Sequence, residues 1–223
     1  MVAAGSSFSA GRQLARAGEP GASALPVPAG RRIVVLSFDD GPNVRYTPTV
    51  LRLLAAHGDH ATFFIIGRNA AAAPQLVADE VAAGDEVGNH TWDHRDLRRL
   101  SAVDVLHELQ QAAAAIQHAG GVDPVLFRPP KGEAGAAVAA AAGALGYRTL
   151  LWSLSLEHYV DHGDVRAGVD RLLGQIRPGA VILAHDGGLP NRDRTMAALS
   201  PLLDGLAARG YQVVTAGQLL GLR

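Results

Sequence analysis

The sequence lacks cysteine entirely, which excludes disulfide bonds, thiolate metal sites and cysteine nucleophiles and leaves the redox compartment open. It also lacks a strong net charge: the formal value is −1, and the Lys and Arg residues are scattered rather than clustered. This distribution predicts neither a nucleic acid nor an anionic membrane as a partner. No apolar run approaches the roughly 20 residues that cross a membrane.

The first 30 residues contain Gly, Ala, Ser and Pro without the continuous apolar stretch of a secretory signal. We predict a flexible lead-in over residues 1–30, which is also what would remain after removal of a signal. Residues 31–223 have the length of a single α/β domain. We expect this domain to be monomeric.

From residue 31 onward, apolar stretches of strand length alternate with stretches of helical pattern. The predicted strands cover residues 33–38, 61–66, 86–88, 125–127, 147–154, 180–184 and 211–214. Predicted helices begin near residues 47, 74, 101, 165 and 195, and an Ala-rich helix ends near residue 146. The hydroxyls of Thr47 and Ser101 are expected to cap two of them. Repeated βα units predict an α/β fold with a parallel sheet, a distorted barrel of the (β/α)7 type.

Polar residues of catalytic type follow four of the predicted strands. They are Asp39 and Asp40 after the first, His90 after the third, Arg128 after the fourth and His185 after the sixth. In a parallel barrel the active site lies at the C-terminal ends of the strands. We therefore expect these side chains to share one site.

His90 and His94 are four residues apart, and a helical turn here would direct both imidazoles to one side. With one carboxylate from Asp39 or Asp40 they complete a two-His, one-carboxylate set suited to zinc, cobalt, nickel or iron. Such an ion lowers the pKa of its water toward ~7, and the second aspartate could accept the proton. Taken alone, the histidines also fit a solvated turn, and the aspartates fit a structural pair at a strand exit.

Arg128 precedes Pro129 and Pro130, which hold the backbone in an extended conformation and lack two backbone N–H donors. Its guanidinium suits a carboxylate partner, although a surface salt bridge also explains an isolated Arg. His185 ends a buried strand, where a lone His is usually a satisfied polar residue. Opposite a metal site, it is placed to act as general acid.

Together these residues resemble the polysaccharide deacetylases of the NodB-homology type, carbohydrate esterase family four. The resemblance extends from residue 31 to the C-terminus, and its motifs fall in order on successive strand ends. The matching segments are Ser37–Gly41, His90–His94, Arg128–Pro130 and Ile182–His185.

The resemblance implies a role for each of these groups. The implied metal ligands are Asp40, His90 and His94, and the implied catalytic residues are Asp39 as base, Arg128 as the group that orients the base, and His185 as general acid. The implied substrate contacts are Pro129, Pro130, Lys131 (whose backbone N–H binds the oxyanion), Trp152, Tyr159 and Leu183, the last beside the acyl pocket.

One motif departs from the family. Where the family carries Asp-x-x-Asp-Trp, this chain carries Ser155, His158 and Tyr159. Because a Ser cannot stabilise a charged imidazole as a carboxylate does, we expect a weakened His185 and a tilt toward O-acetyl esters. Ser155→Asp should then extend activity to higher pH. Lys131 also occupies a position that is often aromatic in the family, which alters the surface on which a sugar is expected to stack.

The resemblance implies a hydrolase that removes N-acetyl or O-acetyl groups from a polysaccharide of the chitin, peptidoglycan or acetylxylan kind. It implies one divalent ion, zinc with cobalt or nickel as alternatives, and an acetylated oligo- or polysaccharide as partner. Because such polymers lie outside the cell membrane, extracellular or cell-surface action is expected. One alternative is a carbohydrate-binding homologue that has lost turnover through its altered fourth motif. A hydrolase of small cyclic amides ranks last, because such enzymes tend to lose the metal set.

Overall fold

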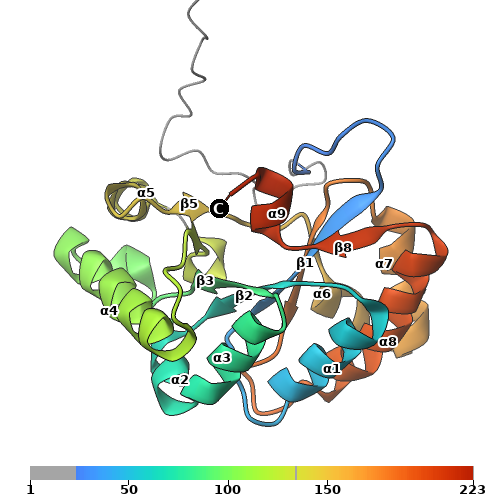
Figure 1. Cartoon of the computed structure of the whole chain (residues 1–223), viewed down its shortest axis with the longest axis horizontal. Helices are drawn as coiled ribbons and strands as arrows, with labels where there is room; N and C mark the ends of the chain where they lie inside the picture. Colours follow the sequence, from blue (N-terminus) through green and yellow to red (C-terminus); the bar gives the residue numbers. More distant parts are fainter. Residues whose placement is uncertain (1–23, 134, 223) are drawn as a thin grey trace, which may run out of the picture.

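The computed structural model describes residues 24–133 and 135–222, arranged as a curled sheet with helices around it (Figure 1). The strands are β1 Ile33–Asp39, β2 Thr62–Ile65, β3 Glu86–Asn89, β4 Leu126–Phe127, β5 Arg148–Thr149, β6 Leu154–Ser155, β7 Val181–His185 and β8 Gln212–Val214. The helices are α1 Thr47–His57, α2 Gly67–Ala72, α3 Pro74–Ala82, α4 Ala102–Gly120, α5 Ala136–Ala144, α6 Leu156–Val160, α7 Val165–Gln175, α8 Asp193–Ala208 and α9 Ala216–Leu220. Two 3₁₀ turns, η1 Leu97–Arg99 and η2 Pro130–Gly132, complete the described elements.

The sheet is parallel throughout and runs in the order β5-β4-β3-β2-β1-β7-β6, with β8 paired to the first half of β1. No pairing joins β5 to β6 within the described residues, so the barrel stays open between them. The helices form an outer ring in which neighbours pack in the order α5, α4, α3, α1, α8, α7, α6. The predicted parallel α/β fold and its distorted barrel are confirmed.

Strand β1 lies in the interior of the sheet, paired with β2, β7 and β8, and is buried along its whole length. Val34, Leu36 and Phe38 point outward into the main core, which α1 and α8 close from outside. Successive strand residues alternate between faces, so Ser37 and Asp39 point to the inner face. The sequence of β1 thereby places a carboxylate inside the barrel, at the carboxyl edge of the sheet.

The predicted strand over residues 147–154 divides into β5 and β6, which pair with different neighbours. The cap predicted at Ser101 is confirmed, because its hydroxyl accepts a hydrogen bond from the Asp104 N–H. The cap predicted at Thr47 is wrong. Residue 46 is the N-cap, and the Thr47 hydroxyl instead accepts from the Asn43 N–H and donates to the buried carboxylate of Asp186.

Residues 1–23 of the predicted lead-in lie outside the described residues. The described part of the lead-in packs on the domain: Leu25 is buried, and its N–H donates to the Gly179 carbonyl over 2.8 Å. Among the described helices, none has the length and apolarity needed to cross a membrane.

Candidate active site

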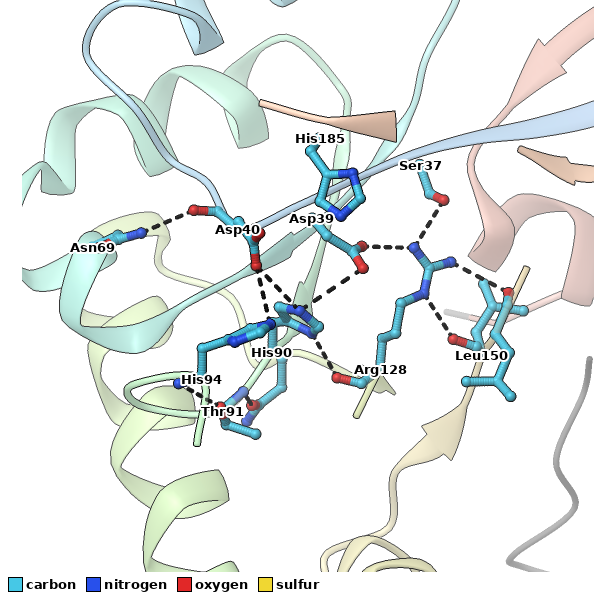
Figure 2. Close-up of polar contacts among 12 residues, drawn as sticks. Ser37, Asp39, Asp40, Asn69, His90, Thr91, His94, Arg128, Leu150 and His185 are labelled. Carbon is cyan, nitrogen blue, oxygen red and sulfur yellow. Dashed lines mark hydrogen bonds and ion pairs between the residues drawn. The ribbon is translucent and has the colours of Figure 1, made fainter. Parts of the chain in front are cut away.

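The carboxyl ends of the strands bring the predicted catalytic residues together, as expected for a parallel barrel. Figure 2 shows the side chains of Asp39, Asp40, His90 and His94 converging, with His185 and Arg128 beside Asp39. Asp39 and His185 are register partners on the neighbouring strands β1 and β7. Side chains in register on adjacent parallel strands share a face, so both project into the same space.

Asp39 is held by the guanidinium of Arg128, which is wholly buried. Nη1 of Arg128 donates to Asp39 Oδ1 over 2.6 Å and to the Ser37 hydroxyl over 3.0 Å. The other nitrogens donate to backbone carbonyls, Nε to Leu150 O and Nη2 to Leu151 O. The surface salt bridge that remained open for Arg128 is therefore excluded, and the carboxylate of Asp39 has a fixed orientation.

Asp40, His90 and His94 form the metal-type cluster that the sequence predicts. Their candidate ligand atoms all lie within 4.8 Å of one another. Asp40 Oδ1 is 3.5 Å from His90 Nε2 and 3.3 Å from His94 Nε2, and this buried oxygen has no hydrogen-bond partner in the described structure. Asp39 stands just outside the cluster, with Oδ2 3.8 Å from His90 Nε2.

The histidines converge without the helical turn that their spacing favours. Residues 90–94 follow an irregular path in which Thr91 and His94 have positive φ values of 69° and 62°. Glu108 of α4 stabilises this path, because its Oε2 accepts hydrogen bonds from the N–H groups of Trp92 and Asp93. A side chain of α4 thus helps to determine where the second imidazole lies.

The tautomer of His90 suits a metal ligand. Its Nδ1 lies 2.7 Å from the Arg128 carbonyl oxygen, which can only accept a hydrogen bond. Nδ1 therefore carries the proton, and Nε2 presents its lone pair to the cluster. Burial, followed by the nearby His90, lowers the pKa of His94, which favours the deprotonated imidazole that metal binding requires.

Burial by itself raises the pKa of Asp40, but the close contact with His90 and the charges of His90, His185 and His94 outweigh it. The net effect lowers that pKa to about 2. Asp40 is therefore ionised at any physiological pH. A carboxylate oxygen that faces two imidazole nitrogens is a donor set that zinc and similar ions accept.

His185 has a carboxylate partner that sequence reasoning missed. Its Nδ1 lies 3.3 Å from Oε1 of the buried Glu157, and the same oxygen accepts hydrogen bonds from the His185 N–H and the Thr195 hydroxyl. Burial alone lowers the pKa of His185, but the contact with Glu157 and its charge raise it above the ordinary value. The expectation that Ser155 leaves the imidazole without carboxylate support is wrong. Ser155 instead lies 3.4 Å from the other oxygen of Glu157.

The register of β6 and β7 explains why the carboxylate beside His185 comes from residue 157 and not from residue 155. Ser155 pairs with Leu183, so residue 157 comes level with His185 when the count is continued by two. The chain turns into α6 at residue 156, and this turn brings the Glu157 side chain back under the imidazole. A register argument applied to the strands would have indicated Glu157.

The predicted substrate contacts lie in different surroundings. Pro129, Pro130 and Leu183 are buried, whereas Lys131 is exposed at a turn with a φ of 59°. Two aromatic residues are partly buried. The Trp152 ring lies 5.6 Å from the Arg128 guanidinium, and Tyr159 packs against the main core. Their roles toward a substrate stay predictions.

Comparison with known proteins points in the same direction as the geometry. The sequence model of the family described as polysaccharide deacetylase matches residues 27–150. A chitooligosaccharide deacetylase of Bradyrhizobium sp. (strain ANU 289) is 39% identical over 206 residues, covering 86% of this chain and 92% of that protein. A peptidoglycan-N-acetylglucosamine deacetylase of Bacillus cereus is 35% identical, covering 87% and 91%. The solved structure of the peptidoglycan deacetylase PdaC from Bacillus subtilis aligns with a TM-score of 0.78 at 32% identity, covering 87% of this chain and 93% of that chain.

Proposed function

The chain belongs to the polysaccharide deacetylase family, a family of hydrolases, and we propose that it removes acetyl groups from N-acetylglucosamine residues of a chitin- or peptidoglycan-type glycan with the help of one divalent ion. The observation that supports this most strongly is the convergence of three ligand atoms beside two separately supported catalytic groups. Asp39 is held by Arg128, and His185 is held by Glu157.

The residues present fit a metal ion. Asp40 Oδ1 is buried and has no partner in the described structure, His90 is locked in the tautomer that frees Nε2, and His94 completes the set. We assign these three as the ligands and zinc as the ion, with cobalt or nickel as substitutes. A divalent ion held there supplies a Lewis acid that polarises the acetyl carbonyl and makes a water more acidic.

Asp39 is the proposed general base. Its carboxylate is oriented by Arg128 and lies next to the ligand cluster, 3.8 Å from His90. It takes one proton from the attacking water while the water oxygen bonds to the acetyl carbon. The backbone N–H of Lys131 is the proposed donor to the oxygen that gains negative charge. Lys131 is the residue that follows the two prolines, in the 3₁₀ turn η2.

His185 is the proposed general acid. It delivers its proton to the sugar nitrogen as the carbon–nitrogen bond breaks, which releases an amine and acetate. Glu157 keeps the imidazole protonated to higher pH than its ordinary pKa allows. The expected preference for O-acetyl esters depended on a His185 without a carboxylate partner, and Glu157 removes that reason. The alternative of an inactive homologue depended on the same missing partner. An N-acetyl group, whose amine leaves only with a proton, suits this supported acid.

Acetylated glycans of these kinds are found outside the cell membrane, so we propose action at the cell surface or beyond it. The relatives named for peptidoglycan deacetylation support this location. A monomeric state is proposed as well, because each catalytic group comes from the one chain.

The test is acetate release from acetylated chito-oligosaccharides, with acetylated xylan in parallel. Chelation should abolish release and added zinc or cobalt should restore it. Asp39→Asn should stop release while leaving metal binding intact, and the matched control Asp204→Asn, at an exposed site on α8, should change neither. Zinc binding without acetate release would support the carbohydrate-binding alternative. Release that survives both chelation and Asp39→Asn would refute the proposed chemistry.

A further inference from the structure

The two oxygens of Asp40 lie in different surroundings. Oδ1 faces His90 and His94 and has no hydrogen-bond partner among the described residues. Oδ2 points the other way, toward the loop that joins β7 to α8, where Nη2 of Arg192 lies 3.7 Å from it. The carboxylate therefore has one face free for an ion and one face turned to a guanidinium.

Arg192 is anchored independently of Asp40. It is 9% exposed, its Nε donates to the Gly187 carbonyl over 2.7 Å, and its backbone N–H donates to the Tyr46 hydroxyl over 3.1 Å. Tyr46 in turn donates to the Asp193 carboxylate over 3.1 Å. A guanidinium fixed at both its backbone and its side chain can orient a neighbouring carboxylate instead of following it.

Two glycines close the space around Asp40. A Cβ at Gly187 would overlap the Asp40 carbonyl, and a Cβ at Gly188, where φ is +77°, would overlap Oδ2. On the opposite side, Nδ2 of Asn69 donates to the Asp40 carbonyl over 2.9 Å. Asp40 itself has a positive φ of 71°, so its backbone depends on these neighbours to stay in place.

We propose that Arg192 is a positioning residue for the metal site, which holds Oδ2 of Asp40 so that Oδ1 alone is presented to the ion. This inference rests on the proposed function, because it assumes that Asp40 is a ligand. It gives each aspartate of the pair its own buried guanidinium, Arg128 for the base and Arg192 for the ligand.

Two effects of Arg192 on metal affinity oppose each other, and the proposal states which one dominates. Its positive charge repels a divalent ion, so its removal by itself would tighten binding. Its orientation of the carboxylate favours binding, and removal of the groups that orient ligands typically weakens metal affinity about 10- to 100-fold. Because Asp40 is 8% exposed and its Oδ2 lies against the backbone at Gly188, we expect orientation to dominate.

The experiment measures zinc affinity of the metal-free protein by competition with a chromogenic chelator, and activity is not needed. Arg192→Gln should raise the Kd for zinc about ten-fold or more. Arg192→Lys, which keeps the charge but loses the hydrogen bond to the Gly187 carbonyl, should fall between Arg192→Gln and the wild type. The matched control is Arg194→Gln, two residues further on in the first turn of α8. Its guanidinium donates to the Val160 and Gly163 carbonyls, and the Kd of this variant should stay at the wild-type value.

Thermal unfolding of the metal-free variants separates positioning from general destabilisation. A Kd for Arg192→Gln equal to the wild-type value, or lower than it, overturns the proposal, as does an equal loss of affinity in Arg194→Gln. If Arg192→Gln does not fold, Arg192→Lys decides: unchanged affinity in that variant overturns the proposal. If the wild-type protein itself binds no zinc, the proposed function fails, and this result is distinct from a failure of Arg192 alone.

Discussion

Replacing Arg128 by Met tests how the barrel stabilises the buried carboxylate of Asp39, the proposed catalytic base. The guanidinium is wholly buried and donates to Asp39, to the Ser37 hydroxyl and to the Leu150 and Leu151 carbonyls. Met has a similar length and fills much of the space, between the rings of Phe64 and Trp152. The substitution therefore removes charge and hydrogen bonds more than it removes packing.

The expected loss of stability follows from the buried groups that lose their partner when the guanidinium is removed. Removing one partner of a buried ion pair costs about 3–5 kcal/mol, because the other charge stays buried and uncompensated. Asp39 is only 3% exposed, so water cannot replace the guanidinium. Two carbonyls also lose a donor, and each can add about 1 kcal/mol or more. We expect a loss of at least about 3 kcal/mol, which lowers the Tm by about 6 °C or more in a domain of this size.

The assay is urea unfolding of the metal-free protein near neutral pH, with Arg128→Met, Asp39→Asn and the double variant compared. The double variant removes both charges, so it should lose less stability than the sum of the two single variants, with a coupling of about 0.5–3 kcal/mol. Arg45→Met, at an exposed pair with Asp193, is the control and should change stability by less than about 1 kcal/mol. Arg128→Met within about 0.5 kcal/mol of the wild type, or strict additivity in the double variant, would refute the reasoning.

Three further predictions follow from single contacts. Glu157→Gln should move the alkaline limb of kcat/KM to lower pH, because Glu157 raises the pKa of His185; a pH profile with an unmoved limb contradicts this. Burial raises the pKa of Asp85 from 3.8 to about 6, so its contribution to stability declines as pH rises through that range. The free energy of unfolding of Asp85→Asn, relative to that of the wild type, should therefore increase by on the order of 2–3 kcal/mol from acid to neutral pH. A difference in urea midpoint between variant and wild type that is the same at both pH values would contradict this. Ser101→Ala should cost about 0.5–2 kcal/mol through loss of its helix cap, as seen in thermal unfolding, and no loss means that the cap is not stabilising.

The sequence was sufficient for the architecture because strand-length apolar runs alternate with helical patterns along nearly the whole chain. It was insufficient where an element is too short to show a period. The run over 147–154 is continuous in the sequence, yet its two halves pair at opposite edges of the sheet as β5 and β6. Helices α2, α6 and α9, of five or six residues each, were likewise not predicted.

The candidate site was predictable to the extent that its residues occupy strand ends. Asp39, Asp40, His90 and His185 could be placed together from the topology alone. Glu157 could not be found by motif position, because the motif places the supporting carboxylate at Ser155. Its role depends on strand register followed by a turn into α6, which are three-dimensional features.

Local backbone geometry was the least predictable part. A spacing of four residues favours a helical turn for His90 and His94, but Glu108 of α4 holds the segment in another conformation. Similarly, the Thr47 hydroxyl had the position of a helix cap, and the buried carboxylate of Asp186 binds it instead. In both cases a long-range acidic partner outweighs a local preference.

The central claim is that Asp40, His90 and His94 bind one divalent ion. The most direct measurement is a zinc titration of the chelator-treated protein, with stoichiometry and affinity read by isothermal calorimetry. The account predicts one ion per chain, a loss of that binding in His94→Ala, and full retention in His118→Ala, a histidine on the far part of α4. Absence of binding in the wild type, or binding that His94→Ala leaves unchanged, would contradict the account.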